Sequence, residues 1–120
     1  APSEFGVLAG ALVLASVLVL GESWPVWASA KAERLSAITA DLERLAESPR
    51  SGQRQAWLEL ETRLLRLLDA SRRPETVARI LQALGLTRES LGRRSGRRDD
   101  FRMAAEYHRR AAERLPRRAL

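Results

Sequence analysis

The sequence predicts an all-α protein, in which one N-terminal transmembrane helix precedes a small bundle of antiparallel helical hairpins. An uncharged apolar run occupies residues 5–21, apolar residues beyond it recur at helical spacing, and glycine or proline clusters separate the helical stretches. We therefore expect residues 1–27 to form a tail, a membrane span and an interfacial segment. Residues 28–71 are expected to form a helical hairpin, and residues 72–120 an arginine-rich helical hairpin. The 120 residues include no cysteine, which excludes disulfides and thiolate metal sites.

The run at residues 5–21 has the length and composition of a membrane anchor. As an α-helix it would rise about 26 Å, close to the roughly 30 Å of a bilayer's hydrocarbon core. Trp24 and Trp27 follow it, at a depth where indole side chains favour the membrane interface. Residues 28–30 have the small-x-small form of a signal-peptidase site, which leaves a cleaved leader as the alternative. No basic residue precedes the run, and this favours a retained anchor.

One side of the predicted span carries small residues. Gly6 and Gly10 form a GxxxG pair, and Ala9 and Ser16 fall on the same side of the helix. Such a face lets a second helix approach closely, so we expect it to pack against another membrane-protein subunit. The alternative is that glycine and alanine are simply common in transmembrane helices. The run has no ionisable side chain, which argues against ion conduction, proton relay and axial cofactor ligation within it.

The charges that flank the span predict its orientation. Glu4 precedes it, whereas Lys31 and Arg34 follow it. Basic residues favour the cytoplasmic side of a membrane. We therefore expect the N-terminus outside and the helical domain on the cytoplasmic face, in a membrane such as the bacterial inner membrane.

The first predicted hairpin has two apolar stripes separated by a break at residues 48–52. Its first helix should bury Leu35, Ile38, Leu42 and Leu45, which follow a 3-4-3 spacing. Its second helix, from about residue 52 to 70, should bury Trp57, Leu60, Leu64, Leu67 and Leu68. Ser51 is the expected N-cap of this second helix, because its hydroxyl could accept a hydrogen bond from a free backbone N–H.

The second predicted hairpin begins at Pro74, which suits the first position of a helix. The inward residues of that helix are Val77, Ile80, Leu81 and Leu84. Gly85 either ends the helix or lies within a longer one that reaches Gly92. A loop is expected at residues 93–98, followed by Asp99 as the N-cap of a last helix. That helix should face inward with Phe101, Ala104, Ala105, His108, Ala111, Ala112 and Leu115, and end before Pro116.

Residues 85–116 resemble one tetratricopeptide repeat. Leu91 and Gly92 match the Leu-Gly pair of its first helix, and the matches in its second helix and end are Phe101, Ala104, Ala111 and Pro116. Arg88 and Ser95 depart from the pattern, because large apolar or aromatic residues are usual there, and Asp99 replaces a turn glycine. The resemblance implies helical-hairpin geometry and a role in protein binding. A generic helical hairpin with alanines at the helix crossing is the alternative.

Positive charge is concentrated in the C-terminal part of the chain. Residues 1–71 hold seven bases and nine acids, a net charge of −2, whereas residues 72–120 hold fourteen bases and six acids, a net charge of +8. The densest group is Arg93, Arg94, Arg97 and Arg98, a candidate site for an anionic partner because guanidinium groups bind carboxylates and phosphates bidentately. The alternative is a solvated helix surface stabilised by pairs spaced i, i+4. Such pairs are Glu59/Arg63, Asp69/Arg73, Glu75/Arg79, Glu89/Arg93 and Glu106/Arg110.

The sequence contains no recognisable catalytic or cofactor motif. It has no glycine-rich phosphate loop, no cluster of metal-binding residues and no Ser-His-Asp arrangement, so we expect no enzyme activity, cofactor or metal. His108, the one histidine, is expected to be a packed side chain. Asp99 and Asp100 are more simply explained by helix capping than by catalysis.

These observations predict a non-catalytic accessory or scaffolding subunit of a larger membrane complex, with a photosynthetic or respiratory energy-transducing complex as one host. The alternative is a membrane-anchored adaptor that recruits an acidic protein or anionic lipid through its C-terminal arginines. A nucleic-acid binder is not expected, because no aromatic residue lies among the clustered arginines.

Overall fold

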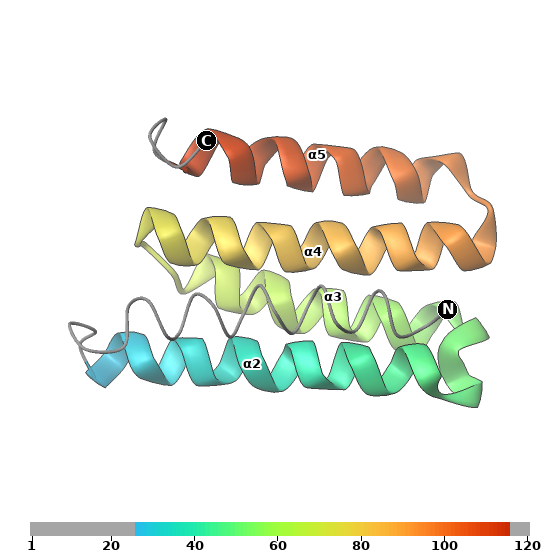
Figure 1. The fold of residues 1–120 in the computed structure, drawn as a ribbon, viewed down its shortest axis with the longest axis horizontal. Helices are drawn as coiled ribbons and strands as arrows, with labels where there is room; N and C mark the ends of the chain where they lie inside the picture. Colours follow the sequence, from blue (N-terminus) through green and yellow to red (C-terminus); the bar gives the residue numbers. More distant parts are fainter. Residues whose placement is uncertain (1–25, 116–120) are drawn as a thin grey trace.

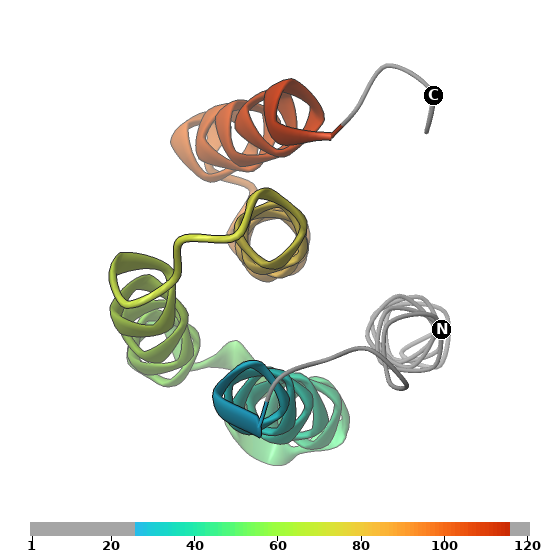
Figure 2. The same cartoon turned by 90° about the vertical axis from the view of Figure 1, so that its left-hand side faces the viewer.

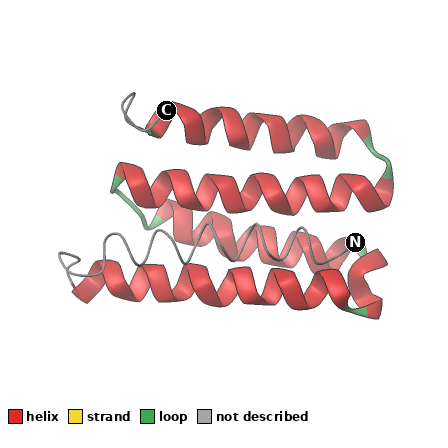
Figure 3. Cartoon of the chain, viewed as in Figure 1, coloured by secondary structure: helices red, strands yellow, loops and turns green. Residues whose placement is uncertain are grey.

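A run of helices that reverses direction at each connection forms the whole described part of the chain (Figure 1, Figure 3). The computed structural model describes residues 26–115, with side chains from residue 30. Within this part the all-α prediction is confirmed, and every regular element is helical. The elements are α2 (Val26–Glu47), the 3-10 helix η1 (Pro49–Gly52), α3 (Arg54–Asp69), α4 (Pro74–Ser95) and α5 (Arg98–Arg114).

Helix α4 lies at the centre of the arrangement. It contacts α2, α3 and α5, and the end-on view of Figure 2 shows it between α3 and α5. Successive helices are antiparallel, which makes α3 and α5 parallel to each other (Figure 1). The α4–α5 turn and the α2–η1–α3 connection consequently lie at the same end of the bundle.

The break between α2 and α3 falls where the sequence predicts it, but its caps differ from the prediction. The Ser48 hydroxyl accepts a hydrogen bond from the backbone N–H of Arg50 (3.0 Å), which caps η1. Helix α3 begins after Gln53, with no side-chain cap. The predicted N-cap at Ser51 is therefore wrong. The Ser51 carbonyl instead accepts a hydrogen bond from the Trp57 indole N–H (2.8 Å).

Helix α4 is one continuous helix with Gly85 in its interior. Pro74 occupies its first turn as predicted, and Gly96 ends it in the left-handed conformation (φ 71°) that glycine adopts without steric cost. Because α4 extends to Ser95, the loop is shorter than predicted. Arg97 is the residue that precedes α5, and Asp99 lies inside its first turn, so the predicted N-cap at Asp99 is wrong.

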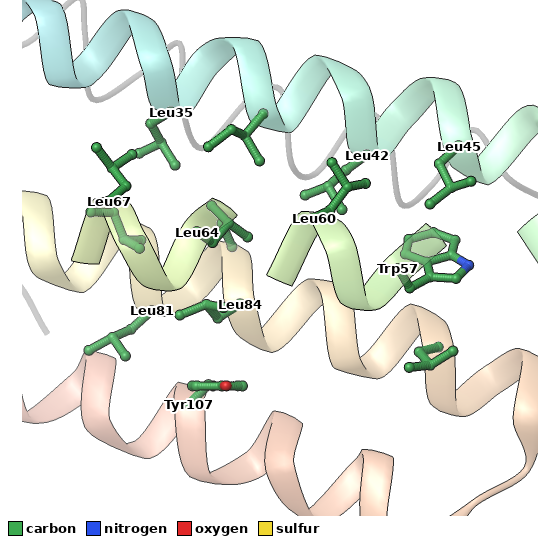
Figure 4. Packing of buried hydrophobic residues seen from close by; sticks show 14 of the residues in the cluster. Leu35, Leu42, Leu45, Trp57, Leu60, Leu64, Leu67, Leu81, Leu84 and Tyr107 are labelled. Atoms are coloured by element: carbon green, nitrogen blue, oxygen red, sulfur yellow. The ribbon is translucent and has the colours of Figure 1, made fainter. Parts of the chain in front are cut away.

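The predicted apolar stripes of α2, α3 and α4 form the core, and Figure 4 shows them packed together. Leu68 is partly buried; the other predicted residues of these stripes are buried. The buried members are Leu35, Ile38, Leu42, Leu45, Trp57, Leu60, Leu64, Leu67, Val77, Ile80, Leu81 and Leu84. Burial of this apolar surface is the main favourable contribution to folding.

The buried side of α5 differs in part from the prediction. Ala104 and Ala111 are buried as expected, but Ala105 and Ala112 are exposed. Asp100 and Tyr107 are buried in their place. The helix is thus rotated about its axis relative to the predicted inward stripe, because the polar atoms of Asp100 and Tyr107 have partners in the interior.

Two aromatic rings of α5 nevertheless lie against glycines of α4. A Cβ atom at Gly92 would approach the Phe101 ring to 3.0 Å, and one at Gly85 would approach the His108 ring to 2.5 Å. Phe101 remains 43% exposed. His108 is half-buried, which agrees with the prediction of a packed side chain. Glycines one heptad apart on α4 therefore let α5 approach closely.

No helix within residues 26–115 is long and apolar enough to cross a bilayer. The span predicted at residues 5–21 lies outside the described residues. The predicted packing positions Gly6, Ala9, Gly10 and Ser16 also lie outside the described residues, as does the predicted interfacial residue Trp24. Trp27 lies in the first turn of α2, and its side chain is outside the described part.

The neighbouring leucines Leu64 and Leu65 test the packing of α3. Leu64 is fully buried, whereas Leu65 is 39% exposed. We expect Leu64→Ala to lower the free energy of unfolding by about 3 kcal/mol, because it leaves a cavity, and Leu65→Ala to lower it by less than about 1 kcal/mol. Urea unfolding followed by circular dichroism measures both. Equal losses would contradict the assigned orientation of α3.

Candidate functional site

The predicted arginine cluster lies at the end of the bundle that holds the α4–α5 turn. Arg93 and Arg94 are in the last turn of α4, where basic residues interact favourably with the helix dipole. Arg97 precedes α5, and Arg98 is its first residue. Arg93, Arg97 and Arg98 are exposed. Among the described residues, no carboxylate forms an ion pair with any of these three guanidinium groups. We call Arg93, Arg97 and Arg98 the end cluster.

Arg94 is separate from the end cluster because its guanidinium group contacts other residues of the bundle, although Arg94 is also exposed. It donates hydrogen bonds to the Ser90 hydroxyl (2.6 Å) and to the Ala46 carbonyl (3.3 Å). The same group lies 4.8 Å from the centre of the Trp57 ring, within the range of a cation–π interaction. Burial, together with the neighbouring charge of Arg93, lowers the pKa of Arg94. Arg94 therefore links α4 to α2 and α3.

The structure also contains a buried ionic network that the sequence analysis did not identify. Arg88 of α4 binds both carboxylate oxygens of Glu61 in α3 (2.5 and 2.9 Å). It also binds Asp100 of α5 (2.8 Å). All three residues are buried, and Asp100 is fully inaccessible. One guanidinium group thus joins three helices.

Three further side chains complete this network. Arg54 of α3 binds both oxygens of Asp100 (2.8 and 2.9 Å), and the Ser95 hydroxyl donates to the same carboxylate (2.7 Å). The Tyr107 hydroxyl donates to Glu61 (3.3 Å). Because the buried charges are paired and hydrogen-bonded, these contacts offset the free-energy cost of removing them from water.

The network shifts the pKa values of its members in the directions that its contacts predict. The hydrogen bond from Arg54 outweighs burial and, with Ser95 and Arg88, holds the pKa of Asp100 well below its usual range. Although burial acts in the opposite direction, the contacts with Glu61 and Asp100 raise the pKa of Arg88. Burial and the adjacent Glu61 carboxylate raise the pKa of Tyr107 to about 12. At neutral pH these shifts keep Asp100 and Arg88 charged and Tyr107 neutral.

The departures from the tetratricopeptide pattern were the available signal for this network. Arg88 lies between the inward residues Leu84 and Leu91 in α4, so its spacing places a charge on a buried face. Such a charge requires a buried partner. The sequence alone does not specify that Glu61 and Asp100 are the partners, because both come from other helices.

Several arginines of the bundle form ion pairs other than the predicted i, i+4 pairs. Arg63 binds Asp41 of α2 (2.7 Å), and Glu106 binds Arg109 (2.5 Å). Some arginines therefore connect different helices. The charged residues are more than a solvated helix surface.

A groove with a basic rim runs between α3 and α5. Its volume is about 480 Å³. It is lined by Leu65, Leu68, Asp69, Ser71, Arg72, Val77, Arg110 and Arg114. The basic groove, as we call it, is lined by the C-terminal halves of α3 and α5, the α3–α4 connection and the start of α4. These segments lie toward the opposite end of the bundle from the end cluster (Figure 1).

No group of three or more His, Asp or Glu side chains within the described residues is placed to hold a metal ion. The chain matches no protein-family model, no curated protein and no solved structure. Its function must therefore be argued from its own residues.

The network makes the stability of the fold depend on pH in the acidic range. The folded-state pKa of Asp100 lies below the ordinary 3.8, so its stabilisation is fully present above that ordinary value and is lost as the pH falls below it. We expect Asp100→Asn to lower the free energy of unfolding at pH 7 by about 3 kcal/mol, because it leaves Arg54 and Arg88 without their shared carboxylate. Urea unfolding at pH 7 and at lower pH measures both effects. The exposed neighbour supplies the control, Asp99→Asn, and similar losses in the two variants would contradict this assignment.

The different environments of Arg93 and Arg94 predict different effects on stability. Arg94→Gln should lower the free energy of unfolding by about 1 kcal/mol, because it removes the contacts with Ser90 and Trp57. Arg93→Gln should leave stability unchanged, because none of the hydrogen bonds and ion pairs found among the described residues involves its side chain. Thermal unfolding of the two variants distinguishes them, and a loss in both or in neither would argue against the structural role of Arg94.

Proposed function

We propose that this chain is a non-catalytic accessory subunit of a membrane protein complex, and that its helical domain binds an acidic surface of a partner protein. The observation that carries the proposal is the end cluster. Arg93, Arg97 and Arg98 are exposed and form no ion pair among the described residues, while the guanidinium groups of Arg54, Arg88 and Arg94 are held by hydrogen bonds to other residues of the bundle. Guanidinium groups in this state are available to a carboxylate-bearing partner.

The resemblance to a tetratricopeptide repeat supports a protein-binding role. Leu91 and Ala104 are buried where α4 packs on α5, and Phe101 lies against Gly92 at the same interface. One difference is that α4 begins at Pro74, well before the expected start of the repeat at Gly85. The resemblance therefore concerns the second half of α4 and all of α5.

The membrane part of the proposal rests on the sequence. The apolar run at residues 5–21, with its small-residue side, supports an anchor that packs against a host subunit. An energy-transducing complex is one host of this kind. If the end cluster instead contacts anionic headgroups, the chain is an adaptor on a lipid surface.

Co-purification from a gently solubilised membrane tests the proposal. We expect the full chain to co-purify with partner proteins in constant ratio, and the triple variant Arg93→Gln, Arg97→Gln, Arg98→Gln to recover at least about fivefold less of them, because charge-assisted hydrogen bonds are lost. The triple variant of Arg66, Arg79 and Arg102 to Gln removes the same charge from other surfaces and is the matched control.

The outcomes separate the proposal from its alternatives. A stable monomer without partners, or equal losses in both triple variants, would contradict the accessory-subunit function. Unchanged protein partners with weaker binding to phosphatidylglycerol vesicles would favour the lipid adaptor.

A further inference from the structure

The basic groove exists because α3 and α5 are bridged along only part of their length. Arg54 binds Asp100, and Tyr107 binds Glu61; each pair is separated by 46 residues, which places the two helices in parallel register. Beyond Glu61 and Tyr107, the hydrogen bonds and ion pairs found among the described residues do not connect α3 with α5. The C-terminal halves of the helices therefore leave the groove between them.

The floor of the basic groove is apolar. Val77 is buried, Leu68 is partly buried and Leu65 is 39% exposed. Leu65 is one of three large hydrophobic residues exposed in the described part of the chain, and its neighbour Leu64 belongs to the core. The exposed apolar surface thus lies inside a concave site, where a partner's side chain could bury it.

The rim of the basic groove has an excess of positive charge. Arg72, Arg110 and Arg114 line it, whereas Asp69 is its one carboxylate. Arg72 donates to the backbone carbonyls of Asp69 (2.9 Å) and Ser71 (3.3 Å), which holds its guanidinium group near the groove.

The ion pairs of two α5 acids, Glu106 and Glu113, are with Arg109 and not with the arginines of this rim. Arg109 binds both Glu106 and Glu113 on the exposed side of the helix. Among the described residues, Arg110 and Arg114 form no ion pair. Arg109 thus leaves the two groove arginines available to an external anion.

We infer that the basic groove binds an acidic amphipathic helix of a partner protein, with apolar side chains on Leu65 and Leu68 and carboxylates on Arg72, Arg110 and Arg114. Charge complementarity and the apolar floor argue together for this ligand. Helix-in-groove binding uses apolar residues at helical spacing flanked by polar ones. The inference shares the protein-binding role of the proposed function, but it concerns a different surface of the bundle.

A free phosphate or a lipid headgroup would use only part of this site. Such ligands can contact the arginines, but the headgroup makes no use of the leucine floor. A helix lying parallel to α3 and α5 would contact both the floor and the rim along the groove. The proposed ligand is therefore distinguished by its dependence on Leu65 as well as on the arginines.

A designed peptide tests the inference directly. The probe is a fluorescent peptide of about 18 residues, long enough to be partly helical, with leucines at helical spacing and glutamates beside them. A shuffled peptide of the same composition controls for charge. Fluorescence anisotropy with the full 120-residue chain in mild detergent measures the dissociation constants.

We expect the amphipathic peptide to bind and the shuffled peptide to bind at least about tenfold more weakly. The double variant Arg110→Gln, Arg114→Gln should weaken binding about tenfold or more, and Leu65→Ser should also weaken it. The control is Arg98→Gln, Arg102→Gln, which removes the same charge from the other end of α5 and should bind as the unmodified chain does. Circular dichroism confirms that each variant is folded.

Three results would overturn the inference. They are equal binding of both peptides, binding that is insensitive to Leu65→Ser, and binding to phosphatidylglycerol vesicles without binding to the peptide. The triple variant Arg93→Gln, Arg97→Gln, Arg98→Gln should retain peptide binding. A negative result for the basic groove therefore leaves the test of the end cluster unaffected. A negative result for the end cluster likewise leaves the test of the basic groove unaffected.

Discussion

The carboxylate of Asp100 is the constraint on which the arrangement of α3, α4 and α5 depends. It is inaccessible to solvent and is bound by Arg54, Arg88 and Ser95, from two helices. A shift of α5 along its axis would leave these charges buried without partners, which is costly. The network therefore fixes the register of the helices. Apolar packing alone would permit several registers.

The same network determines where the surface is open. It fills the space between α3 and α5 at one end of the bundle, and the basic groove begins where these bridging contacts stop. The close approach of α4 and α5 has a different origin, since Gly85 and Gly92 accept the rings of His108 and Phe101. The ionic network and the packing of α5 on the two glycines together determine which surfaces of α5 remain accessible.

Arginine has several distinct roles in this small domain. Arg88 and Arg54 pair with buried acids, Arg94 contacts Trp57, and Arg109 binds the acids of its own helix. The end cluster and the rim of the basic groove remain available to ligands. These two surfaces support a binding function more directly than the net charge of +6 does, because they locate the charge at particular places on the bundle.

The sequence by itself determined the helices and most of the core. The spacing of leucines in α2, α3 and α4 is a local property, and proline and glycine mark the ends of helices through backbone geometry alone. It also predicted the group of four arginines, but not that Arg94 would contact Ser90, Ala46 and Trp57. Only the tertiary structure decided the rotation of α5, the partners of Arg88 and the position of the basic groove. Each of these depends on side chains that are distant in the sequence and meet only when the helices pack, so no local pattern contains them.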